Sequence, residues 1–316
     1  MNMCGIGGFY NCTGGNTPMK ALKSLWKGLE VRGRHASGFA VGWKDSDAPI
    51  VVKGAGPTLP LMHKLNRFAG GTTTQFVLLH NRYTTQGSVK NNANNHPVTE
   101  HGMVVTHNGV LWNDTQTLRT LGIDRVAEVD TEAINAGLHY KSPGWVLDNI
   151  TGSMSIAWVD AGKSPDTVHL MTNGDNPLVI ARTTKGDVVW CSTKSILDKS
   201  KFKIDEDRWF HATPFKVYSI TPDGIIRSEI VSKQTAPADL GGPRYPKNPK
   251  WSRNTSNTTG GRQNARKGPK TTPALIVEVE DEEEEDWWDE PMIEAGFVKV
   301  WQRGEWRWVE ETEVTL

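Results

Sequence analysis

Apolar residues recur through residues 1–235 in short alternating runs, which is the pattern of half-buried strands. Ten runs predict strands: Gly5–Tyr10, Gly38–Trp43, Ile50–Lys53, Phe76–His80, Met103–His107, Ser153–Val159, Val168–Met171, Leu178–Ala181, Val188–Ser192 and Phe215–Ile220. Turn residues separate these runs, and only a few stretches repeat with helical spacing. Runs of strands with a few intervening helices predict an α+β fold with mainly antiparallel sheets.

Three helices are predicted where a capping residue precedes an apolar repeat. They begin after Thr17 (with Pro18 in the first helical position), after Asp130 or Thr131, and at Ser142-Pro143. Ser, Thr and Asp are favoured N-caps, and Pro is favoured at the first helical position. The first two helices should run to Leu29 and Leu138.

Composition changes sharply after the globular part. Residues 236–274 hold six Pro, five Gly and eight Lys or Arg against one acid. Such a segment buries too little apolar surface to offset its ordering entropy, so it predicts a disordered linker. Residues 275–290 form an acidic run, with ten carboxylates in the thirteen residues from Glu278 to Glu290, which is typical of a solvated tail. Residues 291–316 are rich in Trp and alternate around Arg303-Gly304, which predicts a β-hairpin.

The Trp-rich hairpin has two interpretations. A lone two-stranded hairpin is marginally stable in water, and aromatic side chains are favoured anchors at protein interfaces. The hairpin is therefore either a docking element for a partner or for the catalytic domain, or a small appended packing unit.

Charge and cysteine content narrow the function classes. Lys plus Arg and Asp plus Glu both number 36, so the net charge is zero. A neutral chain gives no general argument for nucleic-acid binding, and only the basic linker could contact nucleic acid weakly. No apolar run reaches the roughly 18 residues that a membrane span needs. Three cysteines cannot form a disulfide framework, and no secretory signal is visible. We expect a soluble cytoplasmic protein.

Cys4 begins the segment Cys-Gly-Ile-Gly-Gly, whose small residues let backbone and substrate approach closely. In a chain processed to begin at Cys4, a thiol and a free α-amine would share one Cα. The amine has an ordinary pKa of about 8 and the thiol of about 8.5, so the amine can accept the thiol proton near neutral pH. Cys4 is thus a candidate nucleophile with its own base. The alternative is a small buried cysteine in the first strand.

Polar side chains follow the predicted strand Phe76–His80. Arg82, Thr84 and Thr85 lie at its end or in the loop after it, where active-site residues are common. A planar guanidinium binds carboxylates through paired N–H groups. Arg82 is therefore a candidate ligand for a substrate carboxylate, and the alternative is a surface arginine in a polar loop.

The strand that begins at Met103 runs into Asn108-Gly109. A hairpin turn is one interpretation of this dipeptide. The other is an oxyanion hole, in which the Asn108 side chain and the Gly109 backbone N–H donate to one point. Asp130, before the second helix, is explained by helix capping, and it is equally able to receive the ammonium group of a ligand.

The sequence lacks the motifs of common metal and nucleotide sites. Four histidines, at positions 80, 96, 101 and 107, have spacings that match no standard zinc pattern, and no cysteine pair accompanies them. The chain has neither a phosphate-binding P-loop nor a strand–GxGxxG–helix unit. We therefore expect no metal and no cofactor.

Several short motifs follow one another in a specific order: Cys4-Gly5-Ile6, Arg32-Gly33, Ser37-Gly38, His80-x-Arg82-Tyr83-x-Thr85-x-Gly87, Asn95-His96-Pro97, His107-Asn108-Gly109 and Asp130-Thr131-Glu132. This set resembles the class II glutamine amidotransferase domain of the N-terminal nucleophile hydrolase superfamily, from about Cys4 to Leu197. The resemblance implies a four-layer αββα sandwich with two mainly antiparallel sheets.

The resemblance also implies a reaction. Cys4 would attack the side-chain amide of glutamine, form a γ-glutamyl thioester and release ammonia, with its own α-amine as the base. Asn108 and Gly109 would hold the tetrahedral oxyanion. These roles need Cys4 to be the mature first residue.

The same resemblance assigns the two ends of the substrate. Arg82 would bind the α-carboxylate of glutamine, with Thr84 or Thr85 nearby, and Asp130 would bind the α-amino group. The ammonia would go to a separate synthase partner, because the residues after 235 contain no Ser-Gly-Gly-x-Asp-Ser adenylating loop and leave no room for a sugar-isomerase or phosphoribosyltransferase domain.

Three features depart from the family pattern. Residues 1–3 precede Cys4, so either translation starts at the second Met, which is then trimmed, or a three-residue propeptide is cleaved. The family usually has an aspartate where His35 or Ala36 stands, and the Asn-rich stretch 91–95 is atypical.

Two alternative functions remain open. The first is hydrolysis of a γ-glutamyl amide other than glutamine, in which the same pocket holds the zwitterion and only the leaving amine changes. The second is a non-catalytic binding or assembly protein that retains the fold. The residues before Cys4 and the Trp-rich tail favour the second alternative.

Overall fold

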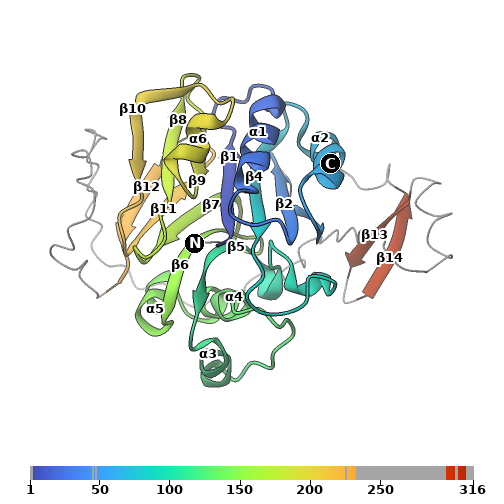
Figure 1. Cartoon of the computed structure of the whole chain (residues 1–316), viewed down its shortest axis with the longest axis vertical. Helices are drawn as coiled ribbons and strands as arrows, with labels where there is room; N and C mark the ends of the chain where they lie inside the picture. The colour runs from blue at the N-terminus through green and yellow to red at the C-terminus, as the bar shows by residue number, and fades with distance from the viewer. Residues whose placement is uncertain are drawn as a thin grey trace, which may run out of the picture.

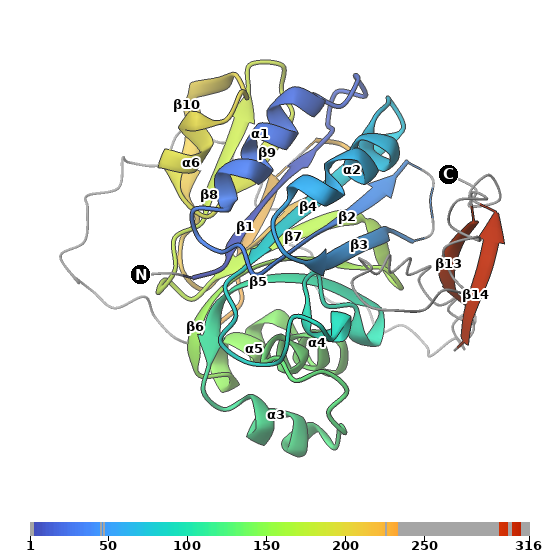
Figure 2. The ribbon, with the colours of Figure 1, turned by 45° about the vertical axis from the view of Figure 1, so that its right-hand side comes forward.

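The computed structural model describes residues 3–44, 46, 48–224 and 226–232, and the backbone of two further strands, 297–302 and 305–310. Two antiparallel sheets stack face to face, and helices cover both outer faces (Figure 1 and Figure 2). The predicted α+β fold, a four-layer αββα sandwich, is confirmed.

The first sheet has seven strands in the order β10-β8-β9-β1-β4-β2-β3, and every neighbouring pair is antiparallel. Its strands are β1 (Gly5–Tyr10), β2 (Ala36–Trp43), β3 (Ile50–Ala55), β4 (Thr74–Arg82), β8 (Val179–Thr183), β9 (Val188–Cys191) and β10 (Ile204–His211). Three helices cover its outer face: α1 (Met19–Leu29), α2 (Met62–Ala69) and α6 (Lys194–Lys199).

The second sheet has five strands in the order β12-β11-β7-β6-β5, again antiparallel throughout. Its strands are β5 (Met103–Leu111), β6 (Gly152–Asp160), β7 (Ser164–Thr172), β11 (Lys216–Ile220) and β12 (Ile226–Ile230). The helices on this side are α3 (Asp114–Leu121), α4 (Thr131–Tyr140) and α5 (Pro143–Asn149). Short 3₁₀ turns occur at Leu59–Leu61, Asn92–Asn94 and Glu100–Gly102.

Three apolar cores separate the four layers. Strand β4 shows how alternation builds them: Val77 and Leu79 face the core under α1 and α2, whereas Phe76 and Leu78 face the core between the sheets. The third core lies between β5–β6 and helices α4 and α5. Side chains alternate across a strand, so a central strand apolar on both faces holds two layers together.

The helix starts show where local capping rules hold. Ser142 Oγ accepts a hydrogen bond from Trp145 N (3.1 Å) at the start of α5, as predicted. Thr17 is not the cap of α1, which begins at Met19 after Pro18. The Thr17 hydroxyl instead donates to the Gly71 carbonyl oxygen (3.1 Å), which ties the chain before α1 to the turn before β4.

Two local interpretations of polar residues, one of which stood beside an alternative, do not hold. Asp130 sits before α4 but its carboxylate makes no capping bond to that helix. Asn108-Gly109 is not a turn, because both residues lie within β5 and pair with Ser155 and Met154 of β6. The sequence pattern also missed β10, β12 and the helices α2, α3 and α6, whose apolar repeats are short.

Strands β13 (Phe297–Gln302) and β14 (Glu305–Glu310) pair antiparallel, with Gln302 opposite Glu305. The basic linker 236–274 and the acidic run 275–290 lie outside the described residues, so the domain boundaries proposed there stay predictions.

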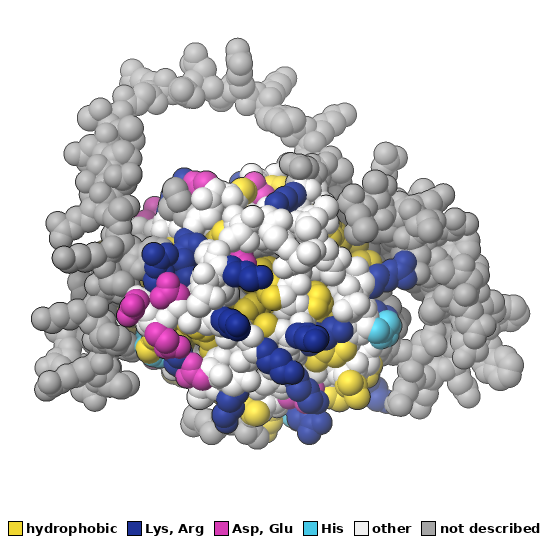
Figure 3. Space-filling model, turned by 90° about the horizontal axis from the view of Figure 1, so that it is seen from above, with side chains coloured by type: hydrophobic (Ala, Val, Ile, Leu, Met, Phe, Trp, Pro, Cys, Tyr) yellow, Lys and Arg dark blue, Asp and Glu magenta, His cyan; other side chains and the backbone are white. Residues whose placement is uncertain are grey.

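Helix α1 lies on the outer face of the larger sheet. Helix α1 exposes Lys20 and Lys27 and has no acidic residue within its span. Figure 3 shows Lys and Arg side chains spread across the upper face of the domain among apolar ones. None of the helices in the described part of the chain has the length and apolar character needed to cross a bilayer.

Candidate active site

Cys4 lies at the entry to β1, the strand between β9 and β4 in the larger sheet. Its sulfur contacts the backbone of Tyr83: Tyr83 N donates to Sγ (3.4 Å) and the thiol donates to the Tyr83 carbonyl oxygen (3.6 Å). Packing leaves little room for a side chain at the glycines after Cys4. A Cβ on Gly8 would fall 2.1 Å from the Trp190 ring, and one on Gly5 would fall 3.0 Å from the Leu29 carbonyl oxygen.

Burial raises the pKa of the Cys4 thiol to about 11, only partly offset by the hydrogen bond from Tyr83 N. The negative charge of Asp130 also raises this pKa, and the guanidinium groups of Arg82 and Arg32 lower it. The thiol is therefore protonated at neutral pH in a chain where Cys4 N is bonded to Met3. Nucleophilic attack from this position requires a base.

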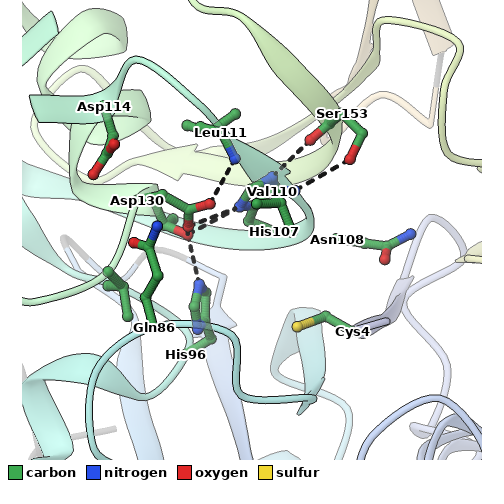
Figure 4. Close-up of polar contacts among 12 residues, drawn as sticks. Cys4, Gln86, His96, His107, Asn108, Val110, Leu111, Asp114, Asp130 and Ser153 are labelled. Atoms are coloured by element: carbon green, nitrogen blue, oxygen red, sulfur yellow. Dashed lines mark hydrogen bonds and ion pairs between the residues drawn. The ribbon is translucent and has the colours of Figure 1, made fainter. Parts of the chain in front are cut away.

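Arg32 connects Cys4 to Asn108. Its Nε donates to the Cys4 carbonyl oxygen (2.8 Å), and Nη2 donates to Asn108 Oδ1 (3.4 Å). Asn108 is fully buried, and its Nδ2 has no partner among the described residues. Because Oδ1 is held by a cation, Nδ2 is the amide atom left to meet a ligand. Figure 4 shows the Asn108 amide and the Cys4 thiol extending from β5 and β1.

The backbone at Gly109 admits no side chain. A Cβ there would lie 1.8 Å from the Ser153 carbonyl oxygen and 2.6 Å from His107 Nε2. Asn176 Nδ2 donates to the Asn108 carbonyl oxygen (3.0 Å), which fixes the peptide between Asn108 and Gly109. This peptide is therefore held from several sides in the middle of β5.

Asp130 is buried with 6% of its surface exposed. Its Oδ2 accepts a hydrogen bond from Leu111 N (2.8 Å), and Oδ1 lies 3.4 Å from Thr131 Oγ1 and 3.6 Å from His107 Nδ1 (Figure 4). Burial by itself would raise the pKa of Asp130, but these contacts outweigh it and hold the pKa below its ordinary value. A buried negative charge is thus maintained beside β5.

Arg82 lies at the end of β4 but is not a surface residue, with 2% of its surface exposed. Nη1 donates to Asn95 Oδ1 (3.0 Å), and Nη2 donates to the carbonyl oxygens of Gln86 and of Gly87 (3.1 Å). Three of the five N–H donors of a guanidinium therefore hold the loop that follows. Thr84 Oγ1 is buried without a partner among the described residues, whereas Thr85 is exposed.

His35, one of the two positions where the resemblance leads us to expect an aspartate, contacts the same loop. Its Nδ1 accepts a hydrogen bond from Thr84 N (3.0 Å), and its ring lies 4.8 Å from that of Tyr83. A ring nitrogen thus satisfies a backbone donor of the loop at this position.

Three histidines lie between the site and the core. His80 Nε2 donates to the His107 carbonyl oxygen (2.9 Å), and the His80 and His96 rings stack at 4.2 Å. His96 Nε2 and His107 Nδ1 both contact Thr131 Oγ1, at 2.7 and 3.0 Å. Burial lowers the pKa of His80 to about 3 and that of His96 well below its usual range. Within the described residues, no cluster of three or more potential metal ligands is present.

The structure thus brings Cys4 and Arg82, at the ends of the central strands β1 and β4, to the same side as Asn108 and Gly109 of β5 and Asp130 before α4. Sequence reasoning did not assign roles to Arg32, Asn176 or the Asn-rich stretch. The motif Arg32-Gly33 in the sequence could have pointed to Arg32, because the structure explains its glycine: a Cβ at Gly33 would lie 2.5 Å from the Arg82 carbonyl carbon. That contact requires a glycine beside the arginine.

Comparison with known proteins gives sequence relatives of one enzyme class. The chain is 33% identical over 141 residues to a glutamine–fructose-6-phosphate aminotransferase of Xylella fastidiosa, covering 44% of this chain and 22% of the relative. It is 28% identical over 199 residues to the same kind of enzyme from Francisella tularensis, covering 56% of this chain and 30% of the relative. The chain therefore spans less than a third of the length of these relatives. No family model matches the chain.

Solved structures share the fold. The glutamine phosphoribosylpyrophosphate amidotransferase from B. subtilis aligns with a TM-score of 0.54 at 19% identity, covering 73% of this chain and 50% of that one. An allosteric regulatory enzyme of purine biosynthesis aligns with a TM-score of 0.55, at the same identity and coverage. The stacked sheets, the ordered sequence motifs and the similar proteins all point to the same kind of domain. The sequence is thus similar to glutamine–fructose-6-phosphate aminotransferases over about half of the chain, and the chain shares the αββα fold of these solved structures.

Proposed function

We propose that this domain hydrolyses the side-chain amide of glutamine and supplies the ammonia to a separate synthase. The observation that supports this most directly is the Asn108 amide. Its Oδ1 is held by Arg32, and its buried Nδ2 has no partner among the described residues, beside a cysteine bound to the same arginine. A buried unsatisfied donor costs free energy unless it meets a ligand, and an oxyanion is the ligand that such a donor stabilises best.

The proposed chemistry begins at Cys4 after removal of residues 1–3. The freed α-amine takes the thiol proton, and the sulfur attacks the δ-carbonyl carbon of glutamine. The tetrahedral oxyanion accepts hydrogen bonds from Asn108 Nδ2 and Gly109 N. The proton passes from the amine to the leaving nitrogen, the C–N bond breaks, and ammonia departs. Water then cleaves the γ-glutamyl thioester, which yields glutamate and regenerates the thiol.

The two ends of the substrate fit the two buried charges. Asp130, whose pKa is lowered, would receive the α-ammonium group. Arg82, with the Thr84 hydroxyl and Thr85, would receive the α-carboxylate through the N–H donors that do not hold the loop. Opposite charges on a fixed scaffold match a zwitterion.

The test combines mass measurement with covalent labelling. Purified protein is analysed intact, then treated with diazo-oxo-norleucine, an electrophilic glutamine mimic, and assayed for glutamate release. We expect a mature chain that begins at Cys4, one added label, and no label in Cys4→Ala. Cys12→Ala is the matched control, because Cys12 is a free, half-buried thiol outside the site. Labelling that persists in Cys4→Ala would overturn the assignment.

One observation favours the non-catalytic alternative. With residue 3 attached, Cys4 has no free amine and its thiol pKa is about 11. Retention of residues 1–3, together with no hydrolysis of glutamine or of other γ-glutamyl amides, would establish that alternative. Hydrolysis of another γ-glutamyl amide but not of glutamine would instead identify an amidohydrolase.

A further inference from the structure

The loop after β4, residues 84–90, is held through its carbonyl groups. Four successive carbonyl oxygens accept hydrogen bonds from side chains. Arg82 donates to those of Gln86 and Gly87, Asn94 Nδ2 donates to that of Ser88 (3.0 Å), and Asn95 Nδ2 donates to that of Val89 (2.8 Å). This loop carries Thr84 and Thr85 of the candidate site, so these donors determine where the carboxylate end of the pocket lies.

Asn94 also contacts the opposite half of the pocket. Its Nδ2 donates to Glu128 Oε2 (2.9 Å), and its Oδ1 accepts from Glu128 N (2.8 Å). Glu128 is two residues before Asp130. One amide side chain therefore links the carboxylate-binding loop to the segment that carries the ammonium-binding aspartate.

Asn95 links the same loop to the arginine. Its Oδ1 accepts from Arg82 Nη1 (3.0 Å), while its own carbonyl oxygen accepts from the buried Lys53 Nζ (3.2 Å). Asn94 and Asn95 are both 0% exposed. Gly87 has a φ of 68°, and a Cβ there would fall 2.8 Å from the Asn94 amide. The pair, here called the asparagine clasp, is thus packed against the loop without space for adjustment.

We propose that the asparagine clasp is a pair of positioning residues that sets the separation between Arg82 and Asp130, and so selects an α-amino acid as substrate. This inference rests on the proposed function. The two charges of an α-amino acid are attached to one carbon, so their separation is fixed, and a site gains affinity only when its partners are preorganised at that separation. The nucleophile and the Asn108 amide lie on β1 and β5, outside the clasp.

The experiment compares Asn94→Ala and Asn95→Asp with the control Asn91→Ala. Asn95→Asp keeps the acceptor for Arg82 but replaces the donor to Val89 with an acceptor. Asn91 belongs to the same Asn-rich stretch, and its exposed side chain accepts from Ala93 N (3.2 Å). Three quantities are measured: amide hydrogen exchange of residues 84–90, KM and kcat for L-glutamine, and kcat/KM for glutaramate, which lacks the α-amino group.

We expect exchange in the loop to rise on the order of tenfold in both clasp variants, because local opening becomes less costly. KM for L-glutamine should rise about tenfold with kcat within about threefold, the pattern of lost ground-state binding. The preference for L-glutamine over glutaramate should fall by about tenfold in Asn94→Ala. Asn91→Ala should match the wild type in all three.

Unchanged exchange together with unchanged KM in both clasp variants would overturn the proposal. So would a fall in kcat with an unchanged KM, because the clasp would then act on the chemical step. A wild-type protein that hydrolyses no glutamine would refute the proposed function, and with it the substrate selection. The exchange data, which need no activity, would then still show whether the clasp holds the loop, so the two failures are distinguishable.

Discussion

Arg32 donates a hydrogen bond from Nε to the carbonyl oxygen of Cys4 at 2.8 Å. The same guanidinium reaches Asn108 Oδ1, so one side chain sets both the nucleophile and the amide proposed to hold the oxyanion. The two contacts use different nitrogens of a rigid planar group. A change in either contact should therefore disturb the other.

Replacing Arg32 by lysine should lower kcat for glutamine by roughly 10- to 100-fold, because a single ammonium cannot reproduce a rigid two-point contact. Steady-state kinetics with purified protein checks this. Arg34→Lys is the control, because Arg34 is exposed and pairs with Glu30 at 3.3 Å. A kcat equal to that of the wild type in Arg32→Lys would contradict the positioning role.

Asn108→Ala and Asn108→Asp should each lower kcat on the order of 10²- to 10³-fold, with a smaller effect on KM. Both remove the Nδ2 donor, and loss of one oxyanion-hole donor has about this effect in other enzymes. Asp also places a negative charge where the oxyanion would form. Stopped assays of glutamate release supply kcat, and thermal unfolding checks the fold. A folded Asn108→Asp variant with wild-type kcat would refute the oxyanion role.

Stability should fall as the pH drops below about 6.5, owing to the buried histidines. The pKa of His80 is lowered to about 3 and that of His96 is also lowered, whereas both titrate near 6.5 in the unfolded chain. Below 6.5 the unfolded state binds protons that the native state does not. The free energy of unfolding therefore decreases by up to about 1.4 kcal/mol per pH unit for each histidine.

Urea unfolding at pH 7.5, 6 and 5 measures this dependence. His80→Gln keeps a donor for the His107 carbonyl oxygen. It should reduce the pH dependence of the unfolding free energy by the contribution of one histidine. An unfolding free energy that stays constant from pH 7.5 to pH 5 would contradict this prediction, because the folded protein would then bind as many protons as the unfolded chain at each pH.

Deleting residues 275–316 should leave glutamine hydrolysis intact and weaken association with a partner, because every residue of the candidate site lies before residue 180. Size-exclusion chromatography with light scattering, run at low and high salt, compares the full chain with the truncated one. The acidic run makes the effect salt-dependent, since exposed charges are screened at high ionic strength. Identical association behaviour for both chains would refute a docking role for the tail.

The sequence pattern predicted the helices and strands that depend on neighbouring residues, through alternation of apolar side chains or through helix capping. Strand β1 has the predicted bounds Gly5–Tyr10, and α5 begins where Ser142 and Pro143 place it. The order of the motifs also led to the αββα sandwich, which the structure confirms, and to a resemblance to glutamine-using enzymes that agrees with the sequence relatives. Short or partly exposed elements such as β10 and α2 were missed, because their apolar repeats are short and tertiary packing stabilises them.

The partners of the polar site residues depended on the tertiary structure. Asp130 looked like a helix cap but accepts a hydrogen bond from Leu111 N, and Asn108-Gly109 looked like a turn but lies within β5. Binding of a substrate carboxylate by Arg82 stays a prediction, and the structure adds that its guanidinium donates to Asn95 and to the carbonyl oxygens of Gln86 and Gly87.

The sequence by itself determined which residue types are available, where the strands alternate and in what order the motifs occur. The stacking of the two sheets decided which of those residues meet, since Arg32 and Asn108 are 76 positions apart and come from different layers. The reason is physical: alternation and capping act over a few residues, whereas a buried polar group takes whichever donor or acceptor the packed layers bring within about 3 Å.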